Sequence, residues 1–192
     1  ATDASQEQLN KAVFKNNISY RKTNETNPHL INNSVDLITV ATAIHWMDQK
    51  LFYKEARRVL KPNGIIAVWG YTGKNVNKSL DPTLDSIINK HLAPYYSENI
   101  NMAFSAYNDL DFPFKKMETP VFKTKKLYQF SDFVNYILSW SASQKYLKIH
   151  NKSPLFLFED ELKDRYTIAL TLLPAAPAWF ESMSARPMYL GL

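Results

Sequence analysis

Apolar and polar positions in the first part of the chain alternate between helical and strand spacing. Ser5, followed three residues later by Gln8, forms a capping box, and the apolar stripe behind it predicts a helix over residues 6–14. Residues 18–22 alternate as in a strand. Residues 35–41 are almost continuously apolar and β-branched, which is typical of a strand buried on both faces.

A helix and a further strand follow this buried segment. Asp48 can cap a helix whose apolar face carries Leu51, Phe52, Ala56, Val59 and Leu60. Residues 61–64 read Lys-Pro-Asn-Gly and end that helix, and residues 65–71 form another buried strand. Strands and helices that alternate at these lengths indicate crossover units and a parallel sheet covered by helices, so we predict an α/β fold.

The sheet is expected to be incomplete at the N-terminus, because residues 1–4 look like the last residues of a strand already under way. After residue 73 the regular alternation of strands and helices stops. Residues 73–130 are therefore predicted to be a lid or substrate-side insertion within a single domain, 1–192. Further elements are expected as a helix around residues 84–92, a strand over 121–128, helices over 131–147 and 161–173, and a strand over 187–192.

Composition narrows the class of protein. Hydrophobic residues make up 45% of the chain and aromatic residues 14%, which is enough for a substantial core. The absence of cysteine excludes disulfides and thiolate metal sites and is compatible with a cytoplasmic location. No apolar run approaches the roughly 20 residues that a membrane span requires. Basic residues are scattered despite the net charge of +5, so neither a membrane nor a nucleic-acid partner is expected.

Polar residues at the carboxyl ends of the predicted strands are the candidates for ligand binding, since ligands sit there in doubly wound sheets. Asp3 ends the first partial strand, where its carboxylate could accept both ribose hydroxyls of a nucleoside cofactor or could help Ser5 to cap the next helix. Thr23 and Asn24 follow the second strand and either read an adenine edge or form a simple turn.

Thr42 and the pair His45 and Trp46 follow the central strand. An imidazole beside an indole could line an active site, although a single histidine there is more often packed or capping. Trp69 and Tyr71 end the next strand as pocket walls or as core residues.

Several signals of other chemistry are missing from the sequence. The chain has four glycines and no Gly-x-Gly, and its histidines lack the spacing of metal ligands. It also lacks a nucleophile elbow and a P-loop. We therefore expect neither a metal site nor serine hydrolase chemistry.

The middle of the chain contains two strings, NSVDLITVATAIHWMD and FYKEARRVLKPNGIIAVWGY. They closely resemble the middle of class I S-adenosylmethionine-dependent methyltransferases, in particular the branch of trans-aconitate methyltransferase and its fungal relatives. TDASQEQLNKA, DFPF and SWSASQKYL extend the resemblance over nearly the whole chain. It implies a Rossmann-like, doubly wound, mostly parallel sheet with helices on both faces.

The resemblance also assigns a cofactor, S-adenosyl-L-methionine, and residues that would hold it. Asp3 would take the ribose hydroxyls, Ala4 would touch adenine, Thr23 and Asn24 would bracket the adenine edge, and Ala41 with Thr42 would contact the methionyl end. Two departures matter. Lys22 and Thr23 stand where the family has an acid or serine after a glycine. The family's first strand, glycine-rich turn and first helix would lie upstream of Ala1, so residues 1–192 alone are expected to bind the cofactor very weakly or not at all.

The expected activity is methyl transfer to a small molecule, in particular a carboxylic acid such as trans-aconitate. A carboxylate acceptor needs no base, whereas a hydroxyl or amine acceptor would use His45. Trp69, Tyr71 and Trp140 are candidates for pocket walls, and Arg186 for pairing an acidic substrate. Two alternatives stay open: a truncated, non-catalytic remnant or binding module, and a nicotinamide-dependent oxidoreductase, which ranks last because a Tyr-x-x-x-Lys spacing is missing.

Overall fold

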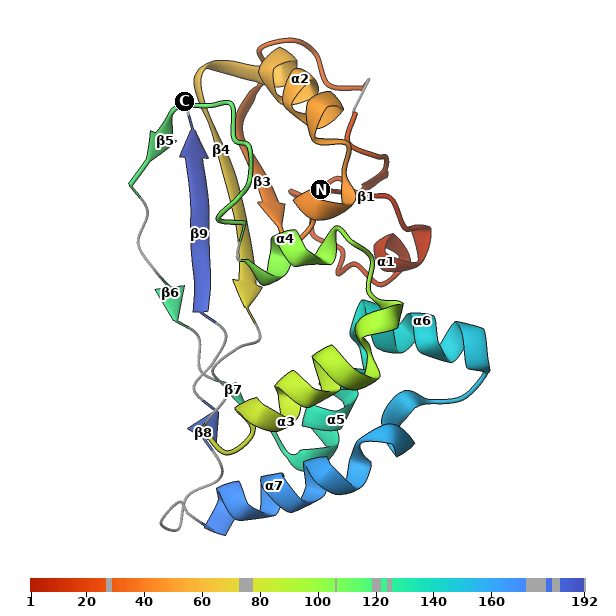
Figure 1. The fold of residues 1–192 in the computed structure, drawn as a ribbon. Helices are drawn as coiled ribbons and strands as arrows, with labels where there is room; N and C mark the ends of the chain where they lie inside the picture. The colour runs from red at the N-terminus through yellow and green to blue at the C-terminus, as the bar shows by residue number, and fades with distance from the viewer. Residues whose placement is uncertain are drawn as a thin grey trace. The chain divides into compact units, whose positions relative to one another are not determined.

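The computed structural model describes residues 1–26, 29–72, 78–105, 107–118, 122–123, 126–171, 179–180 and 184–191. The chain divides into two compact units (Figure 1). The first unit comprises Ala1–Gly70, Tyr107–Pro120 and Pro187–Leu192, and the second comprises Tyr71–Ala106 and Val121–Arg186. The predicted single domain with an insertion over residues 73–130 stays a prediction.

The main sheet is built around two parallel strands. β3 (Val35–Ala41) pairs with β4 (Leu60–Thr72) in a register that runs from Leu37 opposite Ile65 to Ala41 opposite Trp69. The prediction that these two segments are neighbours in one sheet is therefore confirmed. The sheet continues in the order β3-β4-β9-β5, and β5 (Lys116–Met117) lies antiparallel to β9 (Ser184–Gly191).

Two further short pairs involve strands from the second half of the chain. β6 (Phe122–Lys123) pairs antiparallel with the start of β9, and β7 (Lys126–Leu127) pairs antiparallel with β8 (Trp179–Phe180). The structure thus has helices and a mixed sheet, as expected of an α/β fold. One continuous doubly wound sheet is not seen among the described residues.

A gap in strand pairing separates the first two strands from the main sheet. β1 (Thr2–Asp3) and β2 (Arg21–Lys22) form a parallel pair of their own, and within the described ranges neither is bonded to β3. β3 consequently has only β4 as a partner there. Val40 is its one buried residue and Leu37 is 53% exposed, so the prediction that this strand is buried on both faces is wrong.

Helix α2 (Gln49–Val59) begins directly after Asp48, the residue predicted to cap it. The Asp48 carboxylate accepts a hydrogen bond from the backbone N–H of Leu51 at 3.0 Å, which satisfies one free donor of the first turn. The buried face differs by one position from the predicted stripe, because Tyr53 is buried while Leu51 is 46% exposed. Residues 61–64, predicted to end the helix, follow its last residue Val59 and belong to an irregular start of β4, where Asn63 has a φ of 64°.

Other helices differ from prediction mainly in length. α1 (Gln6–Asn10) is capped by the Ser5 hydroxyl as expected but is shorter than residues 6–14. The single helix predicted over residues 131–147 is two helices, α5 (Phe130–Leu138) and α6 (Ser141–His150). The break has a local cause: the Ser139 hydroxyl donates to the Tyr136 carbonyl at 2.6 Å, and the next residue is extended.

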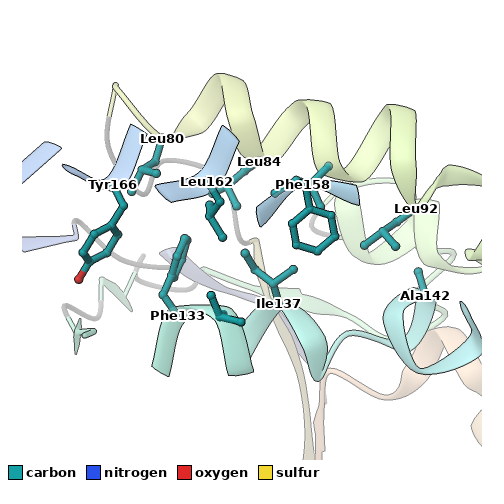
Figure 2. Packing of buried hydrophobic residues seen from close by; sticks show 11 residues of the cluster. Leu80, Leu84, Leu92, Phe133, Ile137, Ala142, Phe158, Leu162 and Tyr166 are labelled. Atoms are coloured by element: carbon teal, nitrogen blue, oxygen red, sulfur yellow. The ribbon is translucent and has the colours of Figure 1, made fainter. Parts of the chain in front are cut away.

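The second unit packs helices around an apolar core (Figure 2). α3 (Asp81–Ser86) continues into a π-helical turn at Ile87–His91, where the sequence predicted one amphipathic helix. Shorter helical segments are Ala93–Tyr95, α4 (Ile100–Phe104) and Pro154–Leu157, and α7 (Glu159–Thr171) closes the set. Core side chains shown in Figure 2 include Leu84, Phe133, Ile137, Phe158 and Leu162.

None of the helices in the described ranges has the length and apolar character needed to cross a bilayer.

Two isoleucines offer a matched test of this core. Ile137 in α5 is fully buried, whereas Ile149 in α6 is 59% exposed. Because both lie in helices, Ile→Ala changes helix propensity equally. Ile137→Ala should lower the free energy of unfolding by about 2–5 kcal/mol, and Ile149→Ala should change it by less than about 0.5 kcal/mol. Urea unfolding followed by circular dichroism measures both. Equal losses would show that Ile137 does not anchor the core.

Candidate functional site

The carboxyl end of β3 is held in a conformation that its residue type disfavours. Thr42 has a φ of 49°, in the left-handed region that β-branched residues seldom enter. Its backbone N–H donates to the Trp69 carbonyl of β4 at 2.8 Å, and Ala41 pairs with Trp69. Strained residues of this kind cluster at binding and active sites. The structure thus brings together Ala41, Thr42 and Trp69 at one sheet edge.

His45 lies just beyond this strand end, in the short helical turn Ile44–Trp46. Its side chain is buried, with 3% of the residue exposed, and its Nδ1 is 2.9 Å from the hydroxyl oxygen of Tyr107. The exposed indole of Trp46 lies beside the imidazole, with ring centroids 4.7 Å apart. Sequence reasoning missed Tyr107, which is 62 residues away along the chain.

Burial sets the charge state of this histidine. Desolvation lowers the pKa of His45 to about 4, because the imidazolium form is deprived of water. The ring is therefore neutral near pH 7 and can accept the Tyr107 proton at Nδ1 or donate its own to the hydroxyl oxygen. A base with so low a pKa removes protons poorly at neutral pH, which weighs against a catalytic role. That role stays a prediction.

Asp3 forms a local hydrogen bond with the helix-capping residue, as in the second of its two predicted roles, which was to help Ser5 to cap helix α1. Its Oδ1 accepts a hydrogen bond from the Ser5 backbone N–H at 2.7 Å, and Ala4 lies between the two. The Asp3 carbonyl accepts the Thr23 N–H at 3.1 Å, because β1 and β2 run parallel and end side by side. The structure therefore brings the predicted residues Asp3 and Thr23 together, with the Asp3 side chain exposed.

Thr23 and Asn24 form a local turn. The Thr23 hydroxyl donates to the Thr26 carbonyl at 2.6 Å, and the Asn24 Oδ1 accepts from the Thr26 N–H at 3.1 Å and from its hydroxyl at 2.9 Å. This is the Asx-turn arrangement that asparagine favours. Their contact with adenine stays a prediction.

The predicted substrate residues are distributed between the two units. Trp69 is a half-buried residue of β4 in the first unit. Trp140 lies in the second unit, where its indole packs edge-on against Tyr136 with centroids 5.7 Å apart. The backbones of Tyr71 and Arg186 belong to β4 and β9, but their side chains lie outside the described part of the structure. The predicted common pocket stays a prediction.

Across the ranges that the structure describes, no three histidine or acidic side chains come together as metal ligands.

Comparison with known proteins gives three similarities. Residues 1–68 match the family model of a methyltransferase domain. A Dictyostelium discoideum protein named "Putative methyltransferase" is 28% identical over 169 residues, which cover 85% of this chain and 64% of that protein. The chain thus spans less than two thirds of this relative. A solved structure from Anaeromyxobacter dehalogenans, named "Putative Type II Methyltransferase", has a TM-score of 0.73 and 24% identity over 97% of this chain and 78% of that one, which shows a shared fold.

The buried imidazole generates a prediction about pH. The pKa of His45 is about 4 in the folded chain and about 6.5 when unfolded, so between these values the unfolded state binds more protons. This contribution to stability is complete above pH 6.5 and is lost as the pH falls towards 4. His45→Asn should therefore flatten the stability profile in that window. The imidazole shift of His45, followed by NMR, should titrate near pH 4, and a midpoint near 6.5 would contradict the burial.

Proposed function

We propose that the chain is part of a class I S-adenosylmethionine-dependent methyltransferase that acts on a small molecule. The match of residues 1–68 to a methyltransferase domain carries this proposal, because that stretch contains every residue predicted to hold the cofactor. Those residues are Asp3, Ala4, Thr23, Asn24, Ala41 and Thr42. The fold shared with the Anaeromyxobacter structure supports it, since the shared part covers almost the whole chain.

The chemistry of the strand-end residues fits S-adenosyl-L-methionine. Asp3 is exposed, and only its Oδ1 is engaged by a hydrogen bond within the described residues, so its Oδ2 can accept ribose hydroxyls. Thr23 is bonded through its backbone to Asp3, and we assign it to the adenine that follows the ribose. Ala41 and Thr42 offer backbone at the second strand end. When bound, the cofactor supplies a methyl group on a sulfonium that an acceptor atom can attack.

The acceptor that agrees best with the site is a carboxylic acid, with trans-aconitate as the reference case. An ionised carboxylate attacks without losing a proton, and His45, the base candidate among the described residues, is a poor base because it is buried and its pKa is about 4. Catalysis would then rest on positioning, which can supply about 7–11 kcal/mol of the barrier. Trp69, Tyr71 and Trp140 remain our candidates for apolar contacts with the substrate, and Arg186 for pairing with its acidic group, each within its own unit.

The unpaired edge of β3 supports the presence of one further strand in the complete protein. Its second edge has no strand partner among the described residues, and Leu37 on it is half exposed. One more parallel strand there would pair these backbone groups and would join β3 to the β1–β2 pair. We propose that the first strand of the family, together with its glycine-rich turn and helix, occupies this place.

A non-catalytic binding module is the second candidate. It is favoured by the same open edge and by the capping bond that already occupies Asp3 Oδ1. A glycine-rich turn lets backbone approach a cofactor closely at a helix N-terminus, and the described residues contain no equivalent. The two candidates differ in whether added strand, turn and helix create cofactor binding.

Cofactor binding can be measured on residues 1–192 and on the same chain extended at its N-terminus by the family's first strand, glycine-rich turn and helix. By titration calorimetry, the shorter chain should bind S-adenosyl-L-methionine very weakly or not at all, and the extended chain should bind it clearly. Asp3→Ala in the extended chain should weaken binding about tenfold or more, since a charge-assisted hydrogen bond is lost.

Asp85→Ala is the matched control, because Asp85 is an exposed carboxylate of α3 in the second unit. It should leave the affinity unchanged. Absence of binding by the extended chain would contradict the methyltransferase proposal and favour the binding module. Tight binding by residues 1–192 alone would show that no added strand is needed.

A further inference from the structure

Tyr107 is a buried residue in an unusual backbone conformation. It is 0% exposed and has a φ of 58°, in the left-handed region that bulky residues avoid. Such a conformation is energetically unfavourable and persists only where surrounding contacts determine it. Those contacts therefore show what the residue holds in place.

The hydroxyl end of Tyr107 reaches the turn after β3. It is 2.9 Å from His45 Nδ1, and the two rings lie 5.8 Å apart between centroids. His45 belongs to the turn in which Trp46 N–H donates to the Ala43 carbonyl and Met47 N–H to the Ile44 carbonyl. A buried imidazole needs a partner for its polar nitrogen, and Tyr107 provides one.

The ring of Tyr107 rests on the end of β4. A Cβ atom placed on Gly70 would lie 2.6 Å from Tyr107 Cε2, closer than real contacts allow. The ring thus fills the space that a side chain at position 70 would need. Glycine at this position permits the close approach.

Two sets of contacts, called ties here, consequently join the carboxyl-terminal parts of β3 and β4. One is the direct hydrogen bond from Thr42 N–H to the Trp69 carbonyl, and the other runs from His45 through Tyr107 to Gly70. All five residues lie in the first unit. The second tie reaches three residues further along the turn than the first.

We propose that Tyr107 is a positioning residue that fixes the turn over residues 42–46 against the end of β4. Its consequence for cofactor binding rests on the proposed function, because Thr42 begins that turn and is one of the residues assigned to the methionyl end. A role in packing alone would be filled equally well by phenylalanine. The hydroxyl bond to His45 is what distinguishes the two roles.

Tyr107→Phe tests this directly, since it keeps the ring against Gly70 and removes only the hydroxyl. Hydrogen exchange of the Trp46 and Met47 amides should become about tenfold faster, which corresponds to the loss of one buried hydrogen bond. The NMR signals of the His45 imidazole should shift. In the N-terminally extended chain, the affinity for S-adenosyl-L-methionine should fall by about three- to tenfold.

Tyr166→Phe is the matched control. Tyr166 is also a buried tyrosine, and its hydroxyl donates to the Tyr128 carbonyl at 2.7 Å in the second unit. This variant should lose similar stability without altering the exchange of Trp46 and Met47 or the His45 signals. Gly70→Ala retains the Tyr107 hydroxyl group but displaces the ring that carries it, so it should weaken the bond to His45 and reproduce the faster exchange.

The proposal is overturned if Tyr107→Phe matches Tyr166→Phe in the exchange of these two amides and in the His45 signals. If the amides exchange faster but the unmodified extended chain binds no cofactor, the positioning role is supported and the proposed function fails.

Discussion

The pairing of β3 with β4 determines where every candidate residue of the main sheet lies. Because the two strands are parallel and Ala41 is opposite Trp69, both strands reach the carboxyl end of the sheet at the same level. Thr42 then bonds back to β4, and its left-handed backbone turns the chain into the segment that carries His45. A shift of one residue in this register would move Gly70 from beneath the Tyr107 ring and would leave a side chain in its place.

Burial of His45 has chemical consequences for the whole edge. An imidazole removed from water keeps its neutral form. It is then better suited to a structural hydrogen bond than to accepting a proton as a base. A site built this way would favour acceptors that arrive already ionised. Under the proposed function, the strand ends would contribute backbone groups and fixed geometry, while charge would come from Asp3, from Arg186 and from the substrate itself. Under the same proposal, catalysis would depend on holding the reactants in position.

Local signals in the sequence predicted the elements that depend on local interactions. The cap at Asp48 and the β-branched run of β3 were read correctly, because capping and strand propensity act over a few residues. Tyr107 could not be found in this way, since its partner is 62 residues distant and no spacing rule links them. The break at Ser139 was missed because the apolar pattern continues across it. Asp3 was left with two readings, since a carboxylate that caps a helix can equally bind a ligand.

The contact between Gly70 and Tyr107 also bears on how the protein can vary. The chain leaves the first unit after Gly70 and re-enters it at Tyr107, and these two residues touch. Residues 71–106 therefore form a long connection whose two ends lie next to each other in the first unit. Lengthening such a closed loop costs free energy that grows only with the logarithm of its length. Residues 71–106 can therefore gain or lose length outside core positions such as Leu84 at a small cost in chain entropy, while the contact of Gly70 with Tyr107 keeps the two ends of the stretch together.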